Sequence, residues 1–173
     1  VVRQLKKLAP NDLRICLDAG TFAAPVYRHF GFNPPQRLMA PLSGAMGYGT
    51  PAAVATALRE PEHPVVCMVG DGGFMMTGNE MILAVQRRLP ILFVLANNGS
   101  YASIRIHQER AYPGRPSGTD LFNPDFSAIA RGFGLRVETV TDEAQIETAL
   151  RRGLQSGEPY FIEVMTSLKV TLP

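Results

Sequence analysis

The sequence has no tryptophan and only two cysteines, Cys16 and Cys67, among its 173 residues. Both cysteines lie inside apolar, strand-like stretches, so we expect buried free thiols rather than a disulfide or a metal site. No apolar run approaches the roughly 20 residues that a membrane span needs. The first ten residues, VVRQLKKLAP, lack the apolar core of a signal peptide. These absences predict a cytoplasmic protein that does not enter a membrane.

The sequence also lacks a strong excess of charge of either sign. Its 17 Lys and Arg residues against 15 Asp and Glu residues give a net charge of +2, and the basic residues are scattered. A nucleic-acid-binding surface would gather them into a patch or stripe, so nucleic acid is excluded as the expected partner. Hydrophobic residues make up 46% and charged residues 18%, as in a globular protein. The length suits one domain over residues 1–173, and the start at Val rather than Met suggests part of a longer protein.

Apolar and amphipathic segments alternate along the chain. Apolar runs predict strands at 13–20, 63–70, 90–97, 135–140 and 159–166. Helical spacing predicts helices at 21–30, 43–60, 77–89, 126–134 and 142–157. The stretches 31–41 and most of 99–125 read as loops, and the start of 99–125 is compatible with a short helix. The strands near 65 and 91 are apolar without alternation, which is typical of strands covered on both faces. The sequence therefore predicts an α/β fold, a doubly wound and mostly parallel sheet flanked by helices.

A carboxylate between glycines ends one of these buried strands. Asp71 follows Gly70 in VVCMVGDGG, and Asn98 ends the next predicted strand in the chain. Carboxyl ends of neighbouring parallel strands share one edge of the sheet, where ligands bind. Carboxylate and amide oxygens favour Mg²⁺, which commonly keeps ligand phosphates in its coordination shell. No P-loop motif is present, and Asp71 inside the glycine pair would repel a dinucleotide pyrophosphate unless a cation intervened.

The same residues carry a resemblance to a known family. GDGG followed by NN, with PLSGAMGYGTPAAVATAL upstream and NNGSYASIR downstream, resembles thiamine diphosphate-dependent enzymes of the acetolactate synthase and benzoylformate decarboxylase type. The resemblance covers their diphosphate-binding (PP) domain, the C-terminal third of such enzymes. It implies thiamine diphosphate and Mg²⁺ as cofactors and a 2-oxo acid as substrate. It also implies a homo-oligomer, a dimer or tetramer, in which a pyrimidine-binding (PYR) domain completes each site.

The resemblance also implies roles for individual residues. Asp71, the Asn98 side chain and the Ser100 carbonyl would bind Mg²⁺. Gly44 and Met46 would contact the pyrimidine ring, with Met46 as an apolar wedge that bends the cofactor. Contacts to the diphosphate would come from Gly20, Thr21, Phe22, Gly72, Gly73, Tyr101 and Ala102. The glutamate that activates the pyrimidine lies on the PYR domain, so no catalytic residue is assigned here and we expect this chain alone to be inactive.

The sequence leaves open which enzyme of this family the chain resembles most. GAMGYGTPAA resembles acetolactate synthases, but their Gln-Trp-Gln-like segment after the NN loop is replaced by RIHQERAYPGRPSGTDL. NNGSYASIR resembles benzoylformate decarboxylases, which would act on a bulkier 2-oxo acid. Pyruvate decarboxylases have a glutamate at the position of Ile104, which argues against that chemistry. A non-catalytic PP module that needs a partner PYR domain is a further alternative, and a nucleotide-binding domain is the least favoured.

Overall fold

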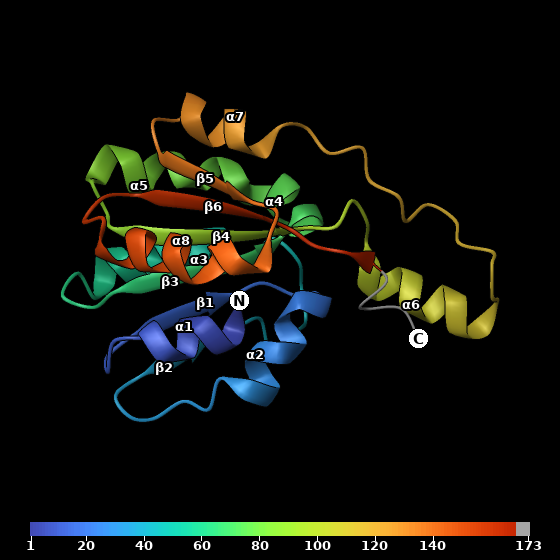
Figure 1. Cartoon of the computed structure of the whole chain (residues 1–173), viewed down its shortest axis with the longest axis horizontal. Helices are drawn as coiled ribbons and strands as arrows, with labels where there is room; N and C mark the ends of the chain where they lie inside the picture. Colours follow the sequence, from blue (N-terminus) through green and yellow to red (C-terminus); the bar gives the residue numbers. More distant parts are fainter. Residues whose placement is uncertain (169–173) are drawn as a thin grey trace.

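The fold is known from a computed structural model that describes residues 1–168. Its centre is a six-stranded, wholly parallel sheet in the order β2-β1-β3-β4-β6-β5 (Figure 1). The strands are β1 (Arg14–Leu17), β2 (Arg37–Met39), β3 (Val65–Gly70), β4 (Ile91–Asn97), β5 (Arg136–Val140) and β6 (Tyr160–Met165). The predicted doubly wound parallel sheet is thereby confirmed.

Helices cover both faces of this sheet. They are α1 (Val2–Leu8), α2 (Ala24–His29), α3 (Gly49–Arg59), α4 (Asp71–Thr77), α5 (Met81–Arg87), α6 (Ala102–Ala111), α7 (Phe126–Gly132) and α8 (Glu143–Gln155), with 3₁₀ turns η1 (Thr21–Ala23) and η2 (Gly78–Glu80). One apolar core lies under α1, α2 and α8, and a second lies under α3, α4, α5 and α7. Helix α6 instead projects beyond the edge where the strands end (Figure 1).

Strand β3 shows why the apolar runs fold this way. All six of its residues are buried, and successive side chains point to opposite faces of a strand. Val66 and Met68 belong to the first core, whereas Val65, Cys67 and Val69 belong to the second. A strand that supplies both cores has no solvent-facing side, which is why its sequence shows no polar alternation.

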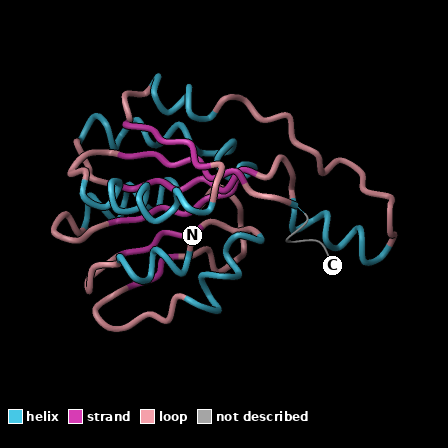
Figure 2. The backbone as a smooth tube through the Cα atoms, in the orientation of Figure 1, coloured by secondary structure: helices cyan, strands magenta, loops and turns pink. Residues whose placement is uncertain are grey.

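Three elements differ from the sequence predictions. The stretch 31–41, predicted as a loop, contains the edge strand β2, whose three residues are half-buried or exposed and leave little apolar pattern. Helix α6 occupies ten residues near the start of the stretch 99–125 (Figure 2), so it is longer than the short helix that the sequence allowed there, because its polar, exposed residues leave no apolar pattern. Helix α4 begins at Asp71, whereas the helix predicted in this part of the chain began only at residue 77, so Gly72 and Gly73 lie in a helix that was not predicted.

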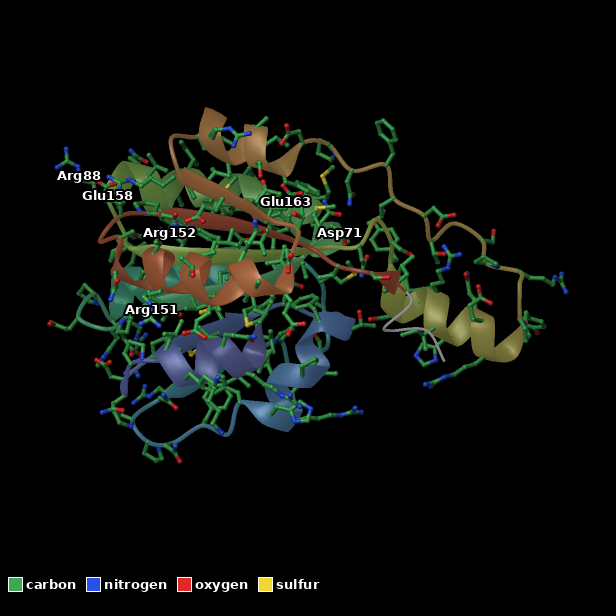
Figure 3. The ribbon with its side chains drawn as sticks, viewed as in Figure 1. Asp71, Arg88, Arg151, Arg152, Glu158 and Glu163 are labelled. Atoms are coloured by element: carbon green, nitrogen blue, oxygen red, sulfur yellow. The ribbon has the colours of Figure 1, made fainter. Side chains whose placement is uncertain are left out.

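The strand order places the candidate site. From β1 the sheet extends to β2 on one side and to β3 on the other, so the order reverses between β1 and β3. Such a reversal leaves a crevice at the carboxyl ends of the strands, where ligands of open α/β sheets bind. Asp71 lies at this carboxyl edge, directly after β3, and Figure 3 shows it near the end of the strands from which α6 projects.

Candidate functional site

A cavity of about 360 Å³ lies at the carboxyl edge, within the range of small-molecule sites. Three strand-end segments, together with the loop before α3, line this cavity. All twelve predicted cofactor-binding residues line it: Gly20, Thr21, Phe22, Gly44, Met46, Asp71, Gly72, Gly73, Asn98, Ser100, Tyr101 and Ala102. The structure therefore brings the predicted set together, while the ligand of each residue stays a prediction.

The Asp71 carboxylate is almost fully buried and has two unequal oxygens. Its Oδ2 accepts hydrogen bonds from the Asn98 N–H at 3.2 Å, the Gly99 N–H at 2.7 Å and Asn123 Nδ2 at 2.8 Å. Its Oδ1 accepts one bond, from the Gly72 N–H at 2.9 Å. Because a carboxylate oxygen has about two lone-pair positions, Oδ2 is saturated. Oδ1 is the oxygen with a position left for a cation.

Asn98 and Ser100 supply further oxygens beside Asp71. Asn98 Oδ1 accepts one hydrogen bond, from the Ser100 N–H at 3.0 Å, and the Ser100 carbonyl accepts one from the Ala102 N–H at 2.8 Å. Each of these oxygens has a second lone pair. One carboxylate, one amide and one carbonyl make an all-oxygen set of the kind that Mg²⁺ prefers. Residues 1–168 contain no cluster of three His, Cys, Asp or Glu side chains that could hold a metal, so a transition-metal site of that kind is not indicated.

Gly72 is required by the close packing of the cavity wall. A Cβ atom at this position would lie 2.5 Å from the Tyr101 ring and 3.0 Å from Met46 Cε. The Met46 side chain, predicted as a wedge, therefore packs closely against the first turn of α4, with no room for a side chain at Gly72 between them. Any larger residue at Gly72 would displace Met46 or Tyr101.

The predicted backbone donors to the diphosphate have partners in this structure. The Gly72 N–H donates to Asp71, the Tyr101 N–H to the Thr119 carbonyl at 2.9 Å, and the Ala102 N–H to the Ser100 carbonyl. Gly73 lies in the first turn of α4, where N–H groups have no carbonyl within the helix to bond. A diphosphate would therefore either share these N–H groups with their present acceptors or replace those acceptors.

Asp18 positions the loop that carries Met46, and sequence reasoning missed it. This carboxylate lies just after β1, is fully buried, and accepts from the N–H groups of Ala19 (2.6 Å), Gly47 (3.0 Å) and Gly49 (2.9 Å). Burial raises the pKa of Asp18, and these N–H donors oppose that rise. Gly47 is held from its other side too, because Thr77 Oγ1 donates to its carbonyl at 2.8 Å. The pattern that could have revealed Asp18 is LDAG, an aspartate and a glycine after an apolar strand, as at Asp71.

Three more polar residues behind Asp71 were also missed. Asn123 donates to Asp71, Asn97 lies at the end of β4, and the buried carboxylate of Glu163 lies on β6. Asn97 was visible in the NN pair but was assigned no role. No local pattern indicates Asn123 or Glu163, because their partners are distant in the chain. Asn123 contacts Asp71, which is 52 residues away, and Glu163 contacts Asn97, which is 66 residues away.

Comparisons with known proteins agree with this geometry. The model of the family described as thiamine pyrophosphate enzyme, C-terminal TPP binding domain, matches residues 18–164. The chain is 33% identical to the acetolactate synthase isozyme 2 large subunit of Escherichia coli, over 95% of this chain and 30% of that protein. It is 32% identical to the acetolactate synthase large subunit of Parasynechococcus marenigrum, over 95% of this chain and 27% of that one. It is also 30% identical to benzoylformate decarboxylase of Pseudomonas aeruginosa, over 92% and 30%. The chain thus spans less than a third of the length of these curated relatives.

Proposed function

The chain belongs to the family of C-terminal thiamine pyrophosphate-binding domains, and from this premise we propose that it holds the cofactor's diphosphate through Mg²⁺. The observation that carries the proposal is the oxygen set at the cavity wall. Asp71 Oδ1, Asn98 Oδ1 and the Ser100 carbonyl each keep a free acceptor position beside a cavity large enough for a small molecule. Three protein oxygens leave the remaining octahedral positions of Mg²⁺ to phosphate oxygens and water.

The remaining lining residues would orient the cofactor. Gly73 and its neighbours in the first turn of α4 present the positive end of a helix to the diphosphate. Phe22 lies across the strand ends, because a Cβ at Gly70 would meet its ring at 2.9 Å. Met46, held by the Asp18-anchored loop, would support the organic rings of the cofactor. When bound, the cofactor supplies carbanion chemistry at the carbonyl carbon of a 2-oxo acid.

For the whole protein we propose acetolactate synthase-like chemistry on a 2-oxo acid, as decarboxylation, carboligation or both. The support is that acetolactate synthases of several organisms align over nearly the whole chain. A benzoylformate decarboxylase-like activity is the second candidate. The observation that favours it is Ile104, a half-exposed apolar side chain in the cavity wall that would suit a bulky apolar substrate group.

The proposal includes a PYR domain, from the same or a second chain, as the source of the activating glutamate, and a homo-oligomeric assembly. Support comes from apolar side chains that are at least half exposed on the segments around the cavity: Leu42, Met75, Met76, Ile104 and Phe122. We also propose cytoplasmic placement, because Cys16 and Cys67 are buried free thiols, the state that a reducing compartment maintains. No helix within residues 1–168 is long and apolar enough to cross a membrane.

Thermal unfolding of the complete protein tests cofactor binding. Mg²⁺ and thiamine diphosphate together should raise Tm, with about 2.7 kcal/mol of stabilisation when the ligand is at a hundred times its Kd. Each alone should have little effect, and Mg²⁺ with NAD should have none. A protein that does not respond to Mg²⁺ with thiamine diphosphate would contradict the proposal.

Asp71→Asn is the matched test of the metal site. The asparagine amide keeps the size of the side chain, but its NH₂ group would face either the N–H donors on Oδ2 or the cation at Oδ1. We expect the Mg²⁺-dependent rise in Tm to be lost. Glu62→Gln removes a carboxylate from an exposed residue in the turn before β3 and should keep the full response. A panel of 2-oxo acids assayed on the complete protein then separates synthase from decarboxylase activity.

A further inference from the structure

A line of hydrogen bonds runs behind the candidate metal site, away from the cavity. Asn123 Nδ2 donates to Asp71 Oδ2 at 2.8 Å and to Asn97 Oδ1 at 2.9 Å. Asn97 Nδ2 donates to Glu163 Oε1 at 2.8 Å. Ser127 Oγ donates to Glu163 Oε2 at 2.7 Å and lies 2.8 Å from Thr139 Oγ1. We call the three residues Asn123, Asn97 and Glu163 the relay.

The carboxylates at the two ends of this line of hydrogen bonds fix its direction. Asp71 and Glu163 are carboxylates, which only accept hydrogen bonds when ionised. Asn123 must therefore turn its NH₂ group to Asp71, and Asn97 must turn its NH₂ group to Glu163. Asn97 Oδ1 then faces Asn123, where it accepts the second hydrogen of the Asn123 amide. No other orientation of the two amides satisfies both carboxylates.

Burial makes this orientation matter. Asp71, Asn97, Glu163 and Ser127 are all less than one-tenth exposed, so a reversed Asn97 amide could not recover its lost bond from water, whereas Asn123 is partly exposed. The relay also joins parts far apart in the chain: the ends of β3 and β4, the segment between α6 and α7, and β6. Figure 3 shows Asp71 and Glu163 in the same half of the sheet, toward its carboxyl edge.

The relay helps to hold the orientation of the Asp71 carboxylate. Asn123 supplies the third donor to Oδ2, beside the two backbone N–H groups of Asn98 and Gly99. Without it, only the two backbone N–H groups would hold Oδ2, and the carboxylate could rotate and share its donors differently between the two oxygens. With it, three donors hold Oδ2, and Oδ1 is the oxygen of this cavity-lining carboxylate that accepts only one.

We propose that Asn123, Asn97 and Glu163 are positioning residues that hold the Asp71 carboxylate with Oδ1 toward the cation. The inference rests on the proposed function, since it assigns the relay to the Mg²⁺ ion proposed there. It predicts that changes to the relay weaken Mg²⁺ binding although none of its three side chains touches the ion.

Asn123→Ala in the complete protein is the direct test. At saturating thiamine diphosphate, the Kd for Mg²⁺ should rise about 10- to 100-fold, the usual cost of removing an outer partner of a metal ligand. Calorimetric titration or the quenching of protein fluorescence by the cofactor measures this Kd. Ser117→Ala is the matched control, because Ser117 lies in the same segment, is exposed, and uses only backbone atoms in its bonds to Gln108. Its Kd should stay at the wild-type value.

Two variants of Glu163 extend the test beyond Asn123. Glu163→Gln can keep an oxygen toward Asn97 and turn its NH₂ to Ser127, so the relay keeps its direction and the Kd should change by less than about threefold. Glu163→Leu leaves the Asn97 NH₂ without an acceptor and should raise the Kd about tenfold or more. This pair gives an answer even if Asn123→Ala does not fold.

The Tm of the metal-free protein is measured for every variant. A purely structural role would lower this Tm and leave the Kd for Mg²⁺ within about twofold of wild type, and that result would overturn the relay proposal. If instead the wild-type protein does not bind Mg²⁺ with thiamine diphosphate, the proposed function fails, and the relay proposal fails with it. The wild-type titration and the variant titrations therefore separate the two failures.

Discussion

Replacing Asp18 with asparagine tests how the loop that carries Met46 is held. The aspartate accepts three backbone N–H groups, two on Oδ1 and one on Oδ2, and is fully buried. Asparagine has only one acceptor oxygen. If that oxygen keeps the bonds to Ala19 and Gly47, the new NH₂ group faces the Gly49 N–H, which is left without a partner.

The expected cost follows from these bonds. An unpaired buried N–H costs about 1–3 kcal/mol, and each remaining bond weakens by about 1 kcal/mol when its acceptor loses its charge. Relief of the buried charge offsets part of this, because burial already raises the pKa of Asp18. We expect a net loss of about 1–3 kcal/mol in the free energy of unfolding, which is roughly 3–10 °C in Tm for a domain of this size.

Thermal and urea unfolding across pH measure the effect. Because the pKa of Asp18 is raised in the folded state, its contribution to stability is fully present below its unfolded pKa and declines as pH rises through the folded pKa. Asp18→Asn removes this titration, so the stability difference from wild type should narrow as pH rises from about 4. A Tm within about 1 °C of wild type would refute the argument from the three donors. Glu62→Gln serves as the control.

Two further predictions concern the core. Gly153→Ala should lower the free energy of unfolding by about 1–3 kcal/mol through overpacking, because its Cβ would lie 2.5 Å from Leu92 Cδ1. Urea midpoints compare it with Gly132→Ala, whose Cβ would meet nothing within 4 Å and which should not be destabilised by packing. Burial raises the pKa of Cys16 to about 11, so a thiol reagent at pH 8 should label it only after unfolding in urea; labelling of the native protein would contradict its buried position. The same raised pKa means that its contribution to stability is complete below about pH 9 and is lost as pH rises through about 11.

Local pattern was enough to predict the parts of the site that come from one strand and the turn after it. Asp71 and Asn98 each follow an apolar run that is buried on both faces, so the position of each at the carboxyl edge could be deduced from a few neighbouring residues. The edge strand β2 and the full length of helix α6 could not be predicted, because neither element buries enough apolar surface to leave a periodic pattern. Helix α4 was not predicted, because glycines disfavour a helix intrinsically, and only the packing of Gly72 and Gly73 against neighbouring residues requires them there.

The parts missed at the site depend on distant partners. Asp18 and Gly49 are 31 residues apart, and Asn123 and Asp71 are 52 residues apart. Aspartate and asparagine occur in many turns, so the role of Asp18 or Asn123 can be deduced only once the fold shows which partner each one contacts. The resemblance to a family, carried by contiguous motifs, likewise identified residues beside the cavity and none of the residues behind Asp71.

A parallel sheet gives the molecule two chemically different ends. All six strands end at the edge with the cavity and begin at the opposite edge, where the turns at 60–64 and 156–159 lead into β3 and β6. Figure 3 shows Arg88 and Glu158 at that opposite end, with Asp71 toward the other. The turn at 156–159 is therefore a suitable place for a fluorescent label or a surface tether. A probe placed there would leave the cavity open and face away from any partner that docks over it.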